Sequence, residues 1–145
     1  AFDLVCFTVQ RMRKDGIFDQ LGGGFGRYSV DSDWIIPHFE KMLYDNGPLL
    51  KLLADAWLVS EDDGQKALFK RAAEQTEVWV MREMQSSEAE DSGGYFSTLD
   101  AGSQGYEGKH YVWTPRAVAQ LLKPAWHTPD ACLVAPTMWL LRGAR

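Results

Sequence analysis

Residues 34–46 hold the densest group of side chains in the chain that are capable of chemistry. The stretch reads Trp-Ile-Ile-Pro-His-Phe-Glu-Lys-Met-Leu-Tyr-Asp-Asn, with an imidazole, two carboxylates, an ammonium group, a phenol and an amide. His38 suits general-base work, because an imidazole ordinarily titrates near ~6.5. Glu40 and Asp45 form a candidate acid–base pair, since glycoside hydrolysis uses two carboxylates roughly 5 to 10 Å apart. We therefore predict that His38, Glu40 and Asp45 are catalytic.

Further residues outside this group are predicted to bind a substrate. Arg27 offers a bidentate fork to a carboxylate or a sugar hydroxyl, and Tyr28 follows it with a phenol. Trp34 lies in a polar segment, and its aromatic face can cover the apolar side of a pyranose ring. Asp100 completes the predicted substrate-binding set.

Each of these assignments has a structural alternative. His38 can instead be an orienting histidine bonded to a backbone carbonyl. Arg27 can pin its own loop by pairing with Asp31, Asp33 or Asp45. Trp57 and Trp79 fall on helical apolar stripes, so we expect both to be core residues.

Composition and charge exclude several functional classes. The 145 residues carry 15 Lys and Arg against 20 Asp and Glu, a formal charge of -5, so a broad basic surface for nucleic acid is not expected. Gly22, Gly23 and Gly24 are followed by no Lys-Ser or Lys-Thr pair, which disfavours a phosphate-binding loop. Cys6 and Cys132 have no metal-type spacing and fit a reducing compartment. We predict no metal and no cofactor.

The chain is also not expected to enter a membrane. No apolar run approaches the roughly 20 residues that a spanning helix needs, and the N-terminus lacks a secretory pattern. We therefore expect a soluble, cytoplasmic protein. Because the sequence starts at Ala1 and enters a helical pattern directly, we expect that it continues upstream in a longer protein.

Four helices are expected to position these residues. Apolar spacing predicts a first helix over residues 2–12, ended by Gly16, and a second that starts near Glu40 or after Pro48 and ends at residues 60–64. A third is expected over residues 65–85, which makes an αα-hairpin with the second. Thr114 and Pro115 predict the start of a fourth, which would end at Pro124. Two strand-like runs, residues 93–97 and 109–113, predict a β-hairpin between the third and fourth helices.

Long blocks of this pattern resemble one protein family. They are G-I-F-D-Q-L-G-G-G-F-G-R-Y-S-V-D at residues 16–31, P-H-F-E-K-M-L-Y-D-N at 37–46, G-G-Y-F-S at 93–97, Asp100-Ala101 and E-G-K-H-Y-V-W-T at 107–114. The sequence is similar to the barrel part of the spermatogenesis-associated, thioredoxin-domain-containing proteins over most of residues 11–122. Residues 124–145 do not align with that pattern.

The resemblance implies a fold and a parent protein. It implies an all-α fold, in which residues 1–123 form the first helical hairpins of an (α/α)6 toroid with a short β-hairpin insertion, and residues 124–145 form an irregular tail. The toroid would be similar to N-acylglucosamine epimerase and six-hairpin glycosidases, with a thioredoxin-like domain upstream. In such toroids the glycine-rich loop and the segment from His38 to Asn46 would face a central cavity. Incomplete closure would leave apolar helix faces exposed, so we also expect self-association.

These expectations lead to one main hypothesis and two alternatives. The main hypothesis is a fragment of a carbohydrate-active-like protein that epimerises or hydrolyses a saccharide. The first alternative is a non-enzymatic binding or regulatory scaffold partnered with the thioredoxin-like domain, and the second is that redox chemistry in that upstream domain is the activity. Departures from the family pattern favour the scaffold: Gly26 stands where the family has His, and Gly102, Gln104 and Tyr106 stand at acidic positions.

Overall fold

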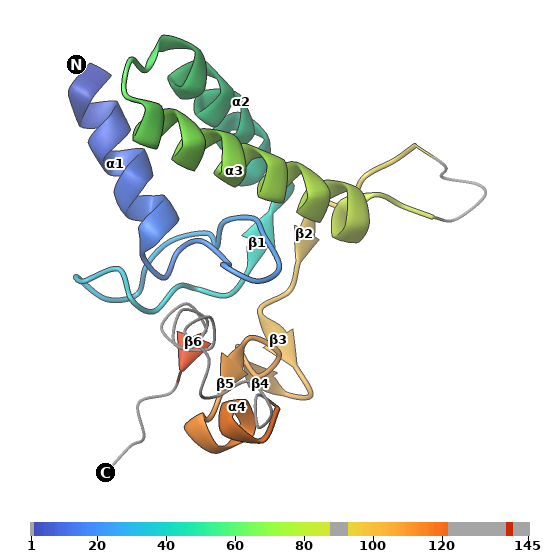
Figure 1. Cartoon of the computed structure of the whole chain (residues 1–145). Helices are drawn as coiled ribbons and strands as arrows, with labels where there is room; N and C mark the ends of the chain where they lie inside the picture. Colours follow the sequence, from blue (N-terminus) through green and yellow to red (C-terminus); the bar gives the residue numbers. More distant parts are fainter. Residues whose placement is uncertain (1, 88–92, 122–138, 141–145) are drawn as a thin grey trace.

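Three helices and a long loop form the main body of the molecule. The computed structural model describes residues 2–87, 93–121 and 139–140. Helix α1 (Phe2–Lys14) leads into an irregular loop that ends at strand β1 (Lys41–Met42), and helices α2 (Leu43–Val59) and α3 (Asp63–Trp79) follow. In Figure 1, α2 and α3 lie side by side with α1 next to them, and the loop runs below α1. The predicted αα-hairpin is thus confirmed.

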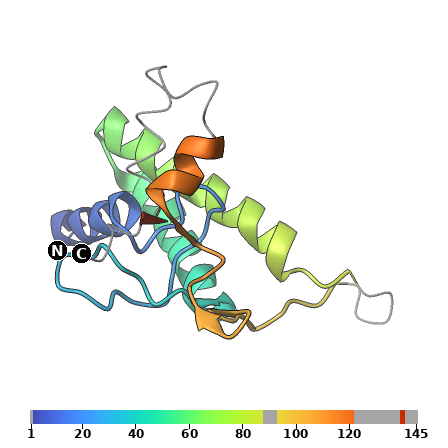
Figure 2. The ribbon, with the colours of Figure 1, turned by 90° about the horizontal axis from the view of Figure 1, so that it is seen from below.

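The remaining elements are short. A π-helical turn, η1 (Val80–Met84), continues α3, and strand β2 (Thr98–Leu99) pairs antiparallel with β1. Strands β3 (Gly102–Ser103) and β4 (Tyr106–Glu107) form a hairpin, and β5 (Val112–Trp113) precedes helix α4 (Pro115–Leu121). Strand β6 (Trp139–Leu140) pairs in parallel with β5. Figure 2 shows α1 and the η1 end of α3 on opposite sides of the molecule.

The core lies where α1, the loop, α2 and α3 meet. Its buried side chains are Cys6, Val9, Ile17, Phe18, Phe25, Leu53, Ala56, Phe69 and Ala72. The loop thus contributes three of them, two of which are the edge-to-face rings of Phe18 and Phe25 at 4.8 Å. Because these rings bury a large apolar area, the glycine-rich loop is ordered by packing and not only by its turns.

Local signals set the helix boundaries well. Asp62 caps α3, because its side chain accepts a hydrogen bond from the N–H of Gln65. Thr114 caps α4 in the same way, since its Oγ1 accepts from the N–H of Ala117 at 3.2 Å, as its sequence predicts. The second helix begins at Leu43, close to the expected start near Glu40 and not after Pro48, which lies inside the helix. Lys41 and Met42 pair with β2 just before this start, and Pro48 costs α2 one backbone hydrogen bond.

Two predictions about side chains and strands are wrong. Trp79 is buried as predicted, but Trp57 is 41% exposed. The buried positions of α2 are Asn46, Leu53 and Ala56, and the residue after Ala56 is rotated by roughly 100° from that face. A β-hairpin is present, but its two strands lie within residues 102–107. In the predicted run 93–97, Tyr95 forms an isolated antiparallel bridge with Gln85. The predicted run 109–113 contains β5, which pairs with β6.

The end of the chain is only partly covered by the structure. Of the tail predicted over residues 124–145, only Trp139 and Leu140 lie within the described residues.

In the described part of the chain, none of the helices combines the length and the apolar character that crossing a membrane requires.

Candidate functional site

The paired segments around Tyr28 and His38 assemble most of the predicted site. The N–H of His38 donates to the carbonyl of Tyr28 at 2.8 Å, and the N–H of Arg27 donates to the carbonyl of Glu40 at 3.0 Å. An antiparallel bridge between Ser29 and Pro37 extends the pairing. These backbone contacts bring Arg27, Tyr28, His38 and Glu40 onto adjacent stretches of extended chain.

The His38 imidazole lies at the centre of this group. Its ring stacks on Tyr28 with 4.9 Å between centroids and 17° between planes. Its Nδ1 is 3.9 Å from Oε2 of Glu40, and its Nε2 is 3.5 Å from Oε1 of Glu107. A carboxylate therefore faces each nitrogen of a ring that remains partly open to solvent.

Arg27 pairs with Glu40, and Asp45 interacts electrostatically with both of them. Arg27 Nη1 donates to Glu40 Oε2 at 2.9 Å, and this hydrogen bond raises the pKa of the Arg27 guanidinium. Asp45 lies in the first turn of α2, where burial raises the pKa of its carboxyl. The positive charge of Arg27 opposes that rise, and the negative charge of Glu40 adds to it. Arg27 thus pairs with Glu40 and not with Asp31, Asp33 or Asp45, the three partners expected from the sequence.

Two predicted substrate-binding residues make other contacts. Trp34 is partly buried and packs against the hydrophobic core, with a positive φ of 60°. The carboxylate of Asp31 stabilises this turn by accepting from the N–H groups of Asp33 and Ile35, at 2.8 and 3.1 Å. Asp100 is exposed, and its carboxylate accepts from the N–H of Gly102 at 2.8 Å. Direct contacts therefore link four of the seven predicted residues, Arg27, Tyr28, His38 and Glu40. Asp45 interacts with Arg27 and Glu40 through charge alone.

Sequence reasoning missed Glu107 as a site residue. Glu107 ends strand β4, more than sixty positions after His38, and only the tertiary structure brings the two side chains together. The residue belongs to the block at 107–114 that carries part of the family resemblance. Its position in that block is the one feature of the sequence that could have marked Glu107 as a candidate site residue.

Lys41 is a second residue that the sequence did not single out, and it is almost fully buried. Its side chain is 2% exposed, and Nζ donates to Asp19 Oδ2 at 2.7 Å and to the carbonyl of Gly23 at 2.8 Å. The rings of Trp79 and Tyr111 each have their centroid 5.2 Å from Nζ. Burial lowers the pKa of Lys41, and Asp19 opposes that shift. Burial also raises the pKa of Tyr111 to about 12.

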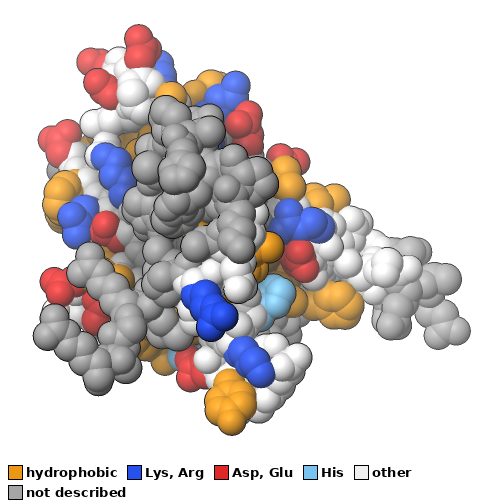
Figure 3. Space-filling model, turned by 60° about the horizontal axis from the view of Figure 1, so that its bottom comes forward, with side chains coloured by type: hydrophobic (Ala, Val, Ile, Leu, Met, Phe, Trp, Pro, Cys, Tyr) orange, Lys and Arg blue, Asp and Glu red, His pale blue; other side chains and the backbone are white. Residues whose placement is uncertain are grey.

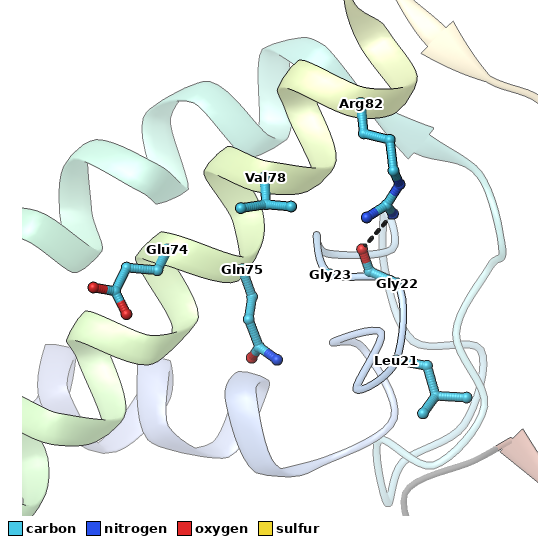
Figure 4. A pocket seen from close by; sticks show the side chains of 7 residues that line it. All are labelled: Leu21, Gly22, Gly23, Glu74, Gln75, Val78 and Arg82. Carbon is cyan, nitrogen blue, oxygen red and sulfur yellow. Dashed lines mark hydrogen bonds between the residues drawn. The ribbon is translucent and has the colours of Figure 1, made fainter.

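A separate depression lies between the glycine-rich loop and α3 (Figure 4). It has a volume of about 180 Å³ and is lined by Leu21, Gly22, Gly23, Glu74, Gln75, Val78 and Arg82. Arg82 Nη2 donates to the carbonyl of Gly22 at 2.8 Å, and Arg82 Nε is 2.7 Å from Glu83. The guanidinium of Arg82 is therefore already bonded to other groups of the protein. The depression shares no lining residue with the His38 group.

The described surface carries mixed charges. On the face drawn in Figure 3, the coloured basic, acidic, histidine and hydrophobic side chains are interspersed. Within residues 2–87, 93–121 and 139–140, no three or more His, Cys, Asp or Glu side chains are arranged to hold a metal ion.

Comparison with known proteins identifies homologous segments. The chain is 36% identical over 128 residues to spermatogenesis-associated protein 20 of Homo sapiens and 38% identical over 128 residues to that of Mus musculus, and both matches cover 84% of this chain. An uncharacterized protein of Caenorhabditis elegans is 36% identical over 124 residues, 79% of this chain. No protein-family model matches the chain. The chain spans about 15% of the length of the two mammalian relatives.

Proposed function

We propose that this chain, homologous to one segment of spermatogenesis-associated protein 20, contributes an acid–base site for a saccharide to a longer protein. The observation that carries the proposal is the His38 imidazole between the carboxylates of Glu40 and Glu107. Epimerisation and hydrolysis of a sugar both require a proton to be removed at one atom and delivered at another. A histidine flanked by two carboxylates supplies groups of the required kinds.

The groups around His38 support this chemistry. Glu40 and Glu107 each approach one nitrogen of the ring, at 3.9 and 3.5 Å, so a carboxyl group lies on either side of the proposed base. Tyr28, half exposed and stacked on His38, offers an aromatic face to a pyranose ring. Asp45 supplies a further carboxyl, whose pKa is raised mainly by burial.

The architecture that we propose around this site is part of an (α/α)6 toroid. The α2–α3 hairpin would be one of its helical pairs, and the His38 group would face the central cavity. This arrangement is inferred from the family resemblance. It does not by itself identify the reaction, because one fold can carry many functions. A thioredoxin-like domain would precede the toroid in the parent protein.

A panel of sugars tests the proposed site. The thermal unfolding of the protein is measured with neutral, amino and acidic monosaccharides and disaccharides, and repeated for His38→Ala, Glu40→Gln and Glu107→Gln. Glu77→Gln, on the exposed face of α3, is the matched control. A saccharide at a hundredfold excess over its Kd should stabilise the wild type and the control by about 2.7 kcal/mol, and the three site variants by less. Equal stabilisation of all variants, or of none, would contradict the proposal.

A non-enzymatic scaffold is the second candidate, and Gly26 favours it. A Cβ added at Gly26 would lie 3.0 Å from the carbonyl oxygen of His38 and 3.1 Å from Pro37. A side chain at this position would require Pro37 or the His38 backbone to shift by a few tenths of an ångström. With Gly26 in place of the histidine of the family pattern, this chain has one acid–base group fewer. If no sugar stabilises the protein, the scaffold is the better description.

A further inference from the structure

The extended segment from Pro37 to Met42 has one buried face and one face that is partly open to solvent. Burial alternates along it: Pro37, Phe39 and Lys41 are buried, whereas His38, Glu40 and Met42 are partly exposed. Since side chains of an extended chain alternate between faces, His38 and Glu40 share the open face and Phe39 and Lys41 share the inner one.

The inner face contacts the segment that carries Glu107. The rings of Phe39 and Tyr111 stack with 5.7 Å between centroids, and Lys41 Nζ lies over the Tyr111 ring. Tyr111 in turn donates its N–H to the carbonyl of Gly108 at 2.9 Å. Gly108, at φ +71°, packs so closely that an added Cβ would lie 2.5 Å from the Phe39 ring. Tyr111 and Gly108 are therefore fixed to the inner face, next to Glu107 in the chain.

Glu107 needs this support from its neighbours. Its side chain is 58% exposed, and its strand has only two residues. An exposed contact between polar side chains contributes little to holding its own geometry, because it loses side-chain entropy and competes with solvent. The 3.5 Å approach of Glu107 to His38 thus depends on where the backbone of Gly108 and Tyr111 is held.

We propose that Lys41 is a positioning residue of the candidate site: its buried contacts with Asp19 and Tyr111 fix the segment that brings Glu107 to His38. The charge of Lys41 is neutralised by Asp19, and its cation–π contacts with Trp79 and Tyr111 connect α3, the glycine-rich loop and the segment after β4. A buried ion pair is a weak source of stability, and replacement of both partners by uncharged groups is often tolerated. The pair is therefore suited to specifying geometry.

The test removes both charges at once. In Lys41→Met/Asp19→Asn, the remaining Asn oxygen still accepts from the N–H groups of Leu21 and Gly22, as Asp19 Oδ1 does now. The matched control is Lys51→Met/Asp55→Asn, which removes an exposed ion pair in α2. The readouts on the full chain are the nuclear Overhauser contact between the His38 ring and the Glu107 side chain, and the amide exchange rate of Tyr111.

The expected result is loss of the His38–Glu107 contact and about tenfold faster exchange at Tyr111 in the first variant, with neither change in the control. The Phe25 amide, bonded to Asn46 in the core, should keep its protection in both. Persistence of the His38–Glu107 contact in the variant would overturn the proposal.

A second variant covers the case in which the double substitution unfolds the protein. Tyr111→Leu keeps the Lys41–Asp19 pair but removes the ring that both Lys41 and Phe39 contact, so it should also abolish the His38–Glu107 contact. Retention of that contact would equally refute the role of Lys41. The inference concerns the site of the proposed function, yet its readouts use no sugar. Failure to bind saccharides and failure of this positioning role are thus separate outcomes.

Discussion

The side chain of Asn46 bonds both backbone groups of Phe25. Its Oδ1 accepts the N–H at 2.8 Å, and its Nδ2 donates to the carbonyl at 3.0 Å. Nδ2 also donates to the carbonyl of Met42, and the whole residue is fully buried. Asn46 therefore fastens the glycine-rich loop to the first turn of α2, close to the segment that carries His38.

Removal of this amide should destabilise the protein. Asn46→Ala leaves the buried N–H and carbonyl of Phe25 without these partners, and each unsatisfied group costs about 1–3 kcal/mol. We expect the free energy of unfolding in urea to fall by at least about 2 kcal/mol. Lys51→Ala, at an exposed position of the same helix, should change it by no more than about 0.5 kcal/mol. Equal effects of the two substitutions would contradict the role assigned to Asn46.

Two glycine substitutions should have opposite effects. Gly24 has φ +81°, and an added Cβ would lie 2.7 Å from the Trp79 ring, so Gly24→Ala should reduce stability by about 1–3 kcal/mol. Gly47 lies within α2 with no atom within 4 Å of an added Cβ, so Gly47→Ala should increase stability by about 0.5–1 kcal/mol. Thermal unfolding of both variants measures the difference. A destabilised Gly47→Ala would show that α2 packs differently from the structure described here.

Asp45 should make stability depend on pH. Its pKa is raised above 3.8 in the folded state, mainly by burial, so the folded state binds its proton more tightly than the unfolded state. The stability from this group is fully present below pH 3.8 and is lost as pH rises through the folded pKa. Asp45→Asn mimics the protonated form. Its melting temperature should exceed that of the wild type at neutral pH, and the difference should shrink as pH falls toward 3.8.

The comparison needs a control for the other carboxylates. Asp55→Asn removes an exposed carboxylate from the same helix and should not reproduce this pH-dependent difference. If the melting temperatures of Asp45→Asn and the wild type differ by the same amount at every pH, titration of Asp45 does not cause the pH dependence of stability.

Exposed apolar side chains on α1 should promote self-association. Leu4 and Phe7 are 70% and 62% exposed and lie three positions apart, hence on one side of the helix. Contiguous exposed apolar surface of this kind favours contacts between molecules. Sedimentation should show association that increases with concentration, and Leu4→Gln/Phe7→Gln should reduce it. A wild type that remains monomeric at all concentrations would contradict this prediction.

The sequence alone determined the local structure of this protein. The apolar spacing of α1 and α3 and the cap at Thr114 could be predicted, as could the choice of Arg27, Tyr28, His38 and Glu40 as candidate site residues. Helix periodicity and capping depend on residues within one or two turns, and the short separation of residues 27 and 40 limits where a paired loop can place them.

The tertiary structure decided which side chains act together. Glu107 reaches His38 only because the segment after β4 packs on the inner face of residues 39–41, and that contact joins positions far apart in the chain. Lys41 has the sequence appearance of a surface residue, yet Asp19, Trp79 and Tyr111 converge on it in the interior. Trp57 and Trp79 lie on similar stripes, but only the second faces the loop. Packing between residues far apart in the chain causes these differences, and the spacing of residues within one helix or loop does not predict them.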